Sequence, residues 1–129
     1  MIRSAFLKGR GYIMAKKIKC PVCGKYEFFE DNDFDICEIC GWENDGVQEE
    51  DHNYAGGANE LSVNEARIEY FLLHNEATAK KALALKNKFY EKMRSARYKN
   101  GGEWSSDIYE KMEKAHKSYM NSLNELLNG

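Results

Sequence analysis

The segment CPVCGKYEFFEDNDFDICEICGW, from Cys20 to Trp42, decides the fold, because it holds all four cysteines of the 129-residue chain in two Cys-x-x-Cys pairs. A spacing of two residues closes a tight turn that points both sulfurs to one side, and two such turns supply the tetrahedral sulfur set that Zn²⁺ prefers. A glycine follows each pair, where the backbone must reverse. We term residues 20–24 the first knuckle and 37–41 the second. We expect one structural zinc ion, held by Cys20, Cys23, Cys37 and Cys40.

Three other uses of four thiols compete with zinc. Paired disulfides suit a secreted domain, but the basic opening MIRSAFLKGRGYIMAKK lacks the apolar run of a signal peptide, so we expect reduced thiols in the cytoplasm. A thioredoxin-like site needs a single Cys-x-x-Cys in a βαβ context. An iron–sulfur or rubredoxin-like iron site uses the same four sulfurs, and the sequence separates it poorly from zinc.

The linker between the knuckles, residues 25–36, predicts a short β-hairpin. KYEFF contains strand-forming residues, EDND contains turn residues, and FDI returns the chain to the second pair. Trp42 and Tyr54 are expected to cover the metal site and this hairpin, with ligand stacking as an alternative role for Trp42. His52 lies in an acidic loop that we interpret as solvated, and a second metal site with Glu49, Glu50 and Asp51 is the alternative.

The residues after the second knuckle carry a family resemblance. With CPVCG before it, CGWENDGVQEEDHNYAGGANELSVNEARIEYF resembles the bacterial cysteine-rich CPCC family, over about residues 18–73. Members run from a C-P-C-C-G knuckle through a G-W-E-D-D-G-x-Q-like stretch to a G-G-A-N turn and an S-x-x-E-A-R helix. Val22 stands where the family name implies a cysteine, but all four expected ligands remain. The resemblance implies a zinc-ribbon-like domain, and it implies no defined biochemical role.

The rest of the chain predicts helices. Ser62 and Glu65 have the spacing of a capping box, so a helix is expected to begin at Val63. Two amphipathic helices then follow, joined by the glycine-containing turn at residues 100–102, and Ser105 or Ser106 caps the second one. Their apolar stripes are Ala82, Leu85, Phe89, Met93 and Ala96, then Ile108, Met112, Ala115, Tyr119, Leu123 and Leu126. We therefore predict an α+β protein, with an N-terminal zinc ribbon and a C-terminal helical hairpin.

Charge divides the chain into three parts. Residues 1–17 carry a net +5 and are expected to be a disordered leader, with Met14 as an alternative start. Residues 18–75, the zinc-ribbon domain, hold three bases and fourteen acids, a net −11. Residues 76–129, the helical hairpin, carry a net +4, with basic residues concentrated in 80–99.

Four classes of function are compatible with the sequence. The first is a non-enzymatic interaction module whose acidic zinc domain binds a basic protein, as an immunity- or antitoxin-like protein would. The alternative is a nucleic-acid-associated protein that uses the basic helix 80–99, tested by reversing Lys86, Lys88 and Lys92. An enzyme is not expected, because no nucleophile with a base, phosphate loop or open metal position is seen. The fourth is a structural zinc domain in a larger assembly, for example a homo-oligomer formed through the helical hairpin. No membrane span is expected.

Overall fold

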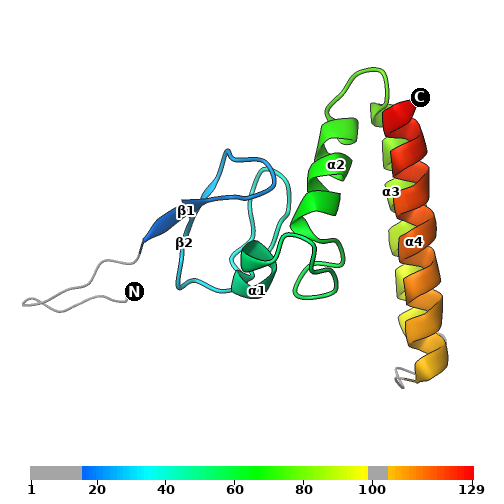
Figure 1. Cartoon of the computed structure of the whole chain (residues 1–129), viewed down its shortest axis with the longest axis horizontal. Coiled ribbons are helices and arrows are strands. Elements are labelled where there is room, and N and C mark those ends of the chain that lie inside the picture. The colour runs from blue at the N-terminus through cyan, green and yellow to red at the C-terminus, as the bar shows by residue number, and fades with distance from the viewer. Residues whose placement is uncertain (1–15, 99–104) are drawn as a thin grey trace, which may run out of the picture. The chain divides into compact units, whose positions relative to one another are not determined.

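The computed structural model describes residues 16–98 and 105–129 and has the expected α+β layout, with a β-hairpin followed by helices (Figure 1). Its elements are β1 (Lys17–Lys19), β2 (Glu27–Phe29), α1 (Gly46–Glu50), α2 (Val63–Leu73), α3 (Ala79–Tyr98) and α4 (Ser106–Asn128). Residues 1–15 of the predicted leader (1–17) and the turn at 100–102 lie outside the described residues, whereas Lys17, the last residue of that leader, begins β1. No helix of the described part is long and apolar enough to cross a membrane.

Two compact units make up the chain, and they divide between Arg67 and Ile68, within α2. We call them the N-terminal unit and the C-terminal unit. The boundary predicted from the sequence lies later, at residue 75, where the charge changes sign.

The β-hairpin of the N-terminal unit does not have the predicted pairing. β2 lies within KYEFF as expected, but its antiparallel partner is β1, with Ile18 opposite Phe28. The first knuckle is itself the turn of this hairpin, since the Cys20 amide donates to the Tyr26 carbonyl at 2.7 Å. The FDI segment, expected to be the second strand, forms only an isolated bridge between Ile36 and Glu43.

A buried amide organises the loops that follow the second knuckle. Gln48 of α1 is 0% exposed. Its Nε2 donates to three main-chain carbonyls at 3.0 to 3.2 Å, those of Tyr54, Asn59 and Leu61. Its Oε1 accepts from both the main-chain and side-chain nitrogens of Asn59 at 3.0 Å. Because every polar atom of this amide is used, Gln48 fixes the path of residues 54–61.

α2 begins as its sequence predicts. The Ser62 Oγ accepts from the Glu65 amide at 3.1 Å, and the Glu65 Oε1 accepts from the Ser62 amide at 2.9 Å. This reciprocal pair confirms the capping box and the helix start at Val63.

The C-terminal unit is built on α3 and α4, which pack against each other along their lengths (Figure 1). The predicted stripes form the contact, since Phe89 stacks on Tyr119 with ring centroids 4.5 Å apart. Ser105 is the N-cap of α4, as one of the two expected candidates. The buried residues of the two helices are Ala82, Phe89, Met93, Ile108, Tyr119, Met120 and Leu123.

One polar contact is buried within this unit. The Tyr119 hydroxyl donates to the Glu69 Oε2 at 2.6 Å, and Lys86 Nζ lies 3.5 Å from the other carboxylate oxygen. Burial raises the pKa of Tyr119, so the hydroxyl remains a donor across the physiological range. The contact joins α2 to α4 within the C-terminal unit.

Replacing Tyr119 with Phe should lower the free energy of unfolding by about 1–3 kcal/mol, because the buried Glu69 carboxylate loses its donor. Urea unfolding followed by far-ultraviolet circular dichroism measures the change. Tyr98→Phe, at an exposed position of α3, is the matched control and should stay within about 0.5 kcal/mol of the native protein. Equal free energies of unfolding in the two variants would show that the hydrogen bond between Tyr119 and Glu69 does not stabilise the protein.

Gly57 is expected to tolerate no side chain. A Cβ there would lie 2.6 Å from Asp45 Oδ2 and 2.9 Å from Gln48 Cδ, and both side chains are held by hydrogen bonds. Gly57→Ala should therefore lower the free energy of unfolding by about 1–3 kcal/mol in urea titrations. Gly46→Ala, where a Cβ meets nothing within 4 Å, should not be destabilising. An unchanged free energy of unfolding in Gly57→Ala would show that the side chains of Asp45 and Gln48 can move to make room for the methyl group.

Candidate metal centre

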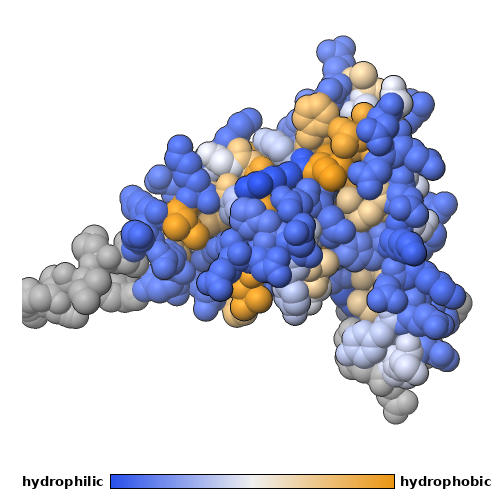
Figure 2. Space-filling model, viewed as in Figure 1, coloured by the Kyte–Doolittle hydropathy of each residue, from blue (hydrophilic) through white to orange (hydrophobic). Residues whose placement is uncertain are grey.

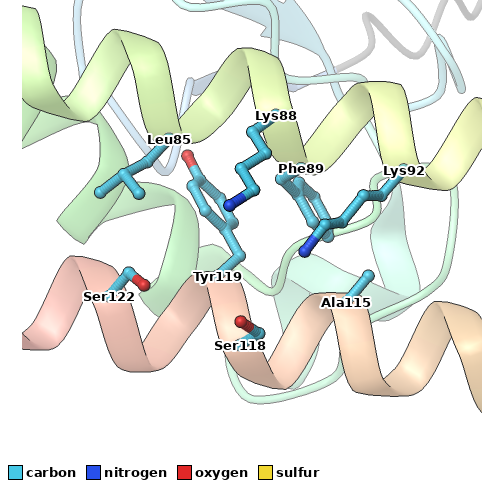
Figure 3. A pocket seen from close by; sticks show the side chains of 8 residues that line it. All are labelled: Leu85, Lys88, Phe89, Lys92, Ala115, Ser118, Tyr119 and Ser122. Carbon is cyan, nitrogen blue, oxygen red and sulfur yellow. The ribbon is translucent and has the colours of Figure 1, made fainter.

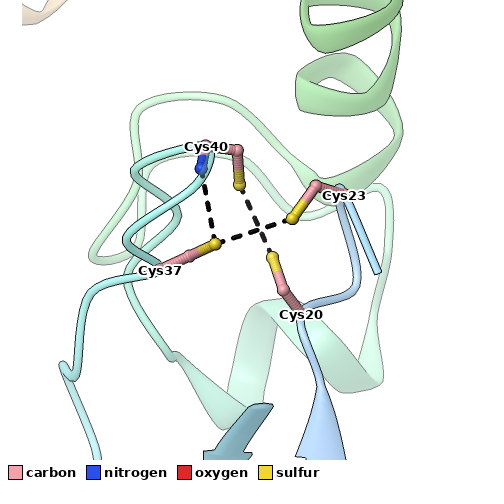
Figure 4. A group of neighbouring side chains, drawn as sticks. All are labelled: Cys20, Cys23, Cys37 and Cys40. Atoms are coloured by element: carbon pink, nitrogen blue, oxygen red, sulfur yellow. Dashed lines mark hydrogen bonds between the residues drawn. The ribbon is translucent and has the colours of Figure 1, made fainter. Parts of the chain in front are cut away.

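The two knuckles bring the four cysteine sulfurs together, all within 4.8 Å of one another (Figure 4). Cys20 Sγ lies 3.5 Å from Cys40 Sγ, and Cys23 Sγ lies 3.6 Å from Cys37 Sγ. A regular tetrahedron with metal–sulfur bonds of about 2.3 Å has edges of about 3.8 Å. The four free thiols therefore have the arrangement of a tetrathiolate metal site, and the set can hold a metal ion.

The knuckles have the same backbone construction. In the first, the Gly24 amide donates to the Cys20 carbonyl, and in the second the Gly41 amide donates to the Cys37 carbonyl, both at 2.9 Å. Both glycines have positive φ, 70° and 84°, which a side chain would oppose. This backbone turns the chain sharply enough to point both sulfurs of each pair inward.

Main-chain amides approach two of the sulfurs. Cys23 Sγ accepts from the Lys25 amide, and Cys37 Sγ accepts from the amides of Ile39 and Cys40, each at 3.4 Å. Such donors moderate the negative charge of thiolate ligands. They therefore favour the ionised form that binds a metal.

The first cysteine of each pair is part of the core. Cys20 and Cys37 are buried with Phe28, Trp42 and Val63 in one hydrophobic cluster. This placement confirms that Trp42 covers the site, and its indole nitrogen donates to the Glu49 carboxylate at 3.0 Å. The ligands and the core of the N-terminal unit are thus built from the same residues.

The expectation for Tyr54 was wrong. Tyr54 is 45% exposed and lies outside the cluster that covers the sulfurs. The main chain explains its position, because the Tyr54 carbonyl is bound by the buried Gln48 amide and its side chain is left outside. Val22, at the position where the family name implies a cysteine, packs against the cluster as an apolar residue.

The contact between Cys20 and Cys40 changes how each thiol ionises. Its hydrogen bond lowers the pKa of Cys20 to about 5 and raises the pKa of Cys40. Burial raises the pKa of Cys23. Because thiolates are the ligands, binding of a metal releases the protons that the thiols still carry, and metal affinity should fall as the pH falls.

Two supports of the site were missed by sequence reasoning. Arg67 Nε donates to the Pro21 carbonyl at 2.7 Å and ties α2 to the first knuckle. Glu49 accepts from both the Trp42 indole and the Asp45 amide through Oε2. Neither contact has a periodic signature, because each joins segments through a single long-range hydrogen bond.

The alternative second metal site around His52 gains no support. Across the described ranges, the four cysteines are the only group of His, Cys, Asp or Glu side chains arranged to hold a metal ion. Glu49, one of its proposed ligands, is engaged by Trp42 and Asp45 instead. That this loop is acidic and solvated stays a prediction.

Two facing knuckles, the first at the turn of a small hairpin and the second within an isolated bridge, define a metal-binding domain that is followed by helices. The chain belongs to the cysteine-rich CPCC family, whose model matches residues 18–87. The match extends past residue 73, where the resemblance ended, and into α3. A search of curated proteins found no match.

Cys37→Ser should abolish metal binding and unfold the N-terminal unit, because binding and folding share one free energy at a tetrathiolate site. Metal content by mass spectrometry and amide dispersion in ¹H–¹⁵N spectra measure the two effects. Ile39→Ser, an exposed position between two ligands of the same knuckle, is the control and should keep both. Full metal content with native dispersion in Cys37→Ser would show that this thiol is not a ligand.

Proposed function

We propose that the protein is a non-enzymatic interaction module, with one structural zinc ion held by Cys20, Cys23, Cys37 and Cys40. Four thiolates in a near-tetrahedral set favour zinc among common divalent ions, and iron in the same set is the alternative. Four protein ligands fill a tetrahedral shell, which suits a structural role. The proposal places the protein in the cytoplasm, where thiols stay reduced.

The observation that carries the proposal is the conformation of Phe34. Its φ of 67° lies in the left-handed region, where a bulky residue costs roughly 1–2 kcal/mol. Its side chain is 63% exposed, so burial offsets little of that cost. The backbone is held in place because the Phe34 amide donates to the Asn44 carbonyl at 2.7 Å. A strained aromatic residue that the core does not use is typical of a binding position.

The surroundings of Phe34 indicate the chemistry of a partner. Other large apolar side chains are exposed in the same unit, among them Ile36 and Ile39 at 51% each. Figure 2 shows such apolar areas within a mostly hydrophilic surface. Exposed acidic residues adjoin them in sequence: Glu30, Asp31, Asp33 and Glu38. We infer a basic protein partner with an apolar side chain that packs on Phe34, bound as an immunity- or antitoxin-like protein binds its target.

Phe34→Asn should remove partner binding without lowering the stability of the fold. Asn tolerates the left-handed region, so the variant should unfold at the same or a higher urea concentration than the native protein. It should nevertheless lose the partner. Tagged native protein and variant, cross-linked and recovered from the producing cells, are compared by quantitative mass spectrometry. A basic protein should be enriched at least about tenfold with the native chain.

Phe71→Asn is the matched control, because Phe71 is an exposed phenylalanine of the C-terminal unit, at 54% against 63% for Phe34. It should retain the partner. Recovery of the same proteins by the native chain and Phe34→Asn would refute the docking role of Phe34. Recovery of the chain alone as a homo-oligomer would favour a structural role instead.

A further inference from the structure

The helical hairpin carries a continuous groove that the metal centre does not use. One hollow is lined by residues of both helices, with Lys88 and Lys92 on α3 and Ser118 and Ser122 on α4 (Figure 3). A second hollow is lined by Lys92, Ser95, Lys111, Lys114 and Ser118. Lys92 and Ser118 line both hollows, so the two form one groove along α3 and α4.

The floor of the groove is apolar and fixed. Phe89 and Tyr119 line it and stack on each other, with an interplanar angle of 7°. Both rings are buried, and the Tyr119 hydroxyl is held by Glu69. Neither ring is therefore free to stack on a ligand. The groups that a ligand meets are the amines and hydroxyls of the rim.

The charge of the groove is of one sign. All charged side chains among the described residues lining the two hollows are lysines, namely Lys88, Lys92, Lys111 and Lys114. Helical spacing explains this, because positions three and four apart share a face. Lys86, expected to belong to a basic face with Lys88 and Lys92, lies elsewhere on α3, where it pairs with Glu69. The groove thus uses only some of the basic residues of α3, and it adds Lys111 and Lys114 of α4.

We propose that this groove binds the phosphate backbone of a nucleic acid. Lysine and serine side chains are typical donors to nucleic-acid phosphates, whereas lysine is depleted at protein–protein interfaces. The lining runs from Leu85 to Ala96 on α3, roughly 16 Å at 1.5 Å per residue. That length matches about five phosphates of one strand at about 3.4 Å each. The described lining of the groove offers no accessible aromatic ring and no group that reads bases. We therefore expect binding that does not depend on the nucleotide sequence.

This site is separate from the proposed protein partner and from the family match. The four lysines all follow residue 87, where the match to the family ends. Binding through them should depend strongly on salt. Four phosphate contacts predict a slope of log affinity against log salt of about −2.8 on a single strand and about −3.6 on a duplex.

The test uses the metal-loaded full chain and a fluorescein-labelled thymidine oligonucleotide, single-stranded or paired, with anisotropy measured from about 50 to about 200 mM salt. Replacing Lys88, Lys92 and Lys114 with Gln should weaken binding at least about tenfold at low salt and reduce the single-strand slope to about −0.7. The same loss of charge outside the groove, Lys80→Gln with Arg94→Gln and Lys117→Gln, should change affinity less than about threefold.

A single substitution provides an independent readout. Ser118→Asp places a negative charge at the centre of the groove and should weaken binding at least about tenfold, whereas Asn124→Asp, on another face of α4, should not. Circular dichroism checks the helices of each variant. Equal losses in groove and control variants would overturn the proposal, as would no binding by the native chain at about 50 mM salt. Binding to phosphatidylglycerol vesicles but not to the oligonucleotides would also overturn it.

Discussion

The N-terminal unit depends on the approach of four cysteine sulfurs to within 4.8 Å of one another. The first knuckle is also the turn of the only hairpin in the described chain, and two of the ligands are also core residues. Thiolates at this separation repel one another unless a cation or a proton lies between them. A unit of this size has little other apolar surface, so we expect its folding to follow metal occupancy.

Polar contacts hold the rest of the N-terminal unit around the four cysteines. Gln48, Asn59 and Asp45 join segments that contain no regular structure, and Arg67 connects α2 to the first knuckle. These bonds order the loops around the metal site. The backbone at Asn44 is held separately, because its amide donates to the Asp35 carbonyl, and its carbonyl accepts from the amide of Phe34, whose backbone is left-handed. Asp35 and Asn44 flank the second knuckle, so the surface proposed to meet a partner continues the backbone that carries two of the sulfurs.

Local signals in the sequence predicted local structure well. The cysteine spacing predicted the four-sulfur cluster, and the capping residues predicted the starts of α2 and α4. The pairing of β2 with β1 could not be predicted from the linker, because a knuckle acts as the hairpin turn. The hydrogen bonds of the buried Gln48 amide and the lysine groove were not predicted from the sequence, for a different reason. Both bring together residues from separate segments, and no periodic pattern marks them.

X-ray absorption at the metal edge of the purified, gently handled protein tests the central claim most directly. It identifies the ion and the atoms bound to it in one measurement. A structural tetrathiolate zinc site should give a zinc edge with four sulfur neighbours at about 2.3 Å and no lighter ligand. A shell that contains nitrogen or oxygen at about 2.0 Å with fewer than four sulfurs, or a chain that folds without any metal, would contradict it.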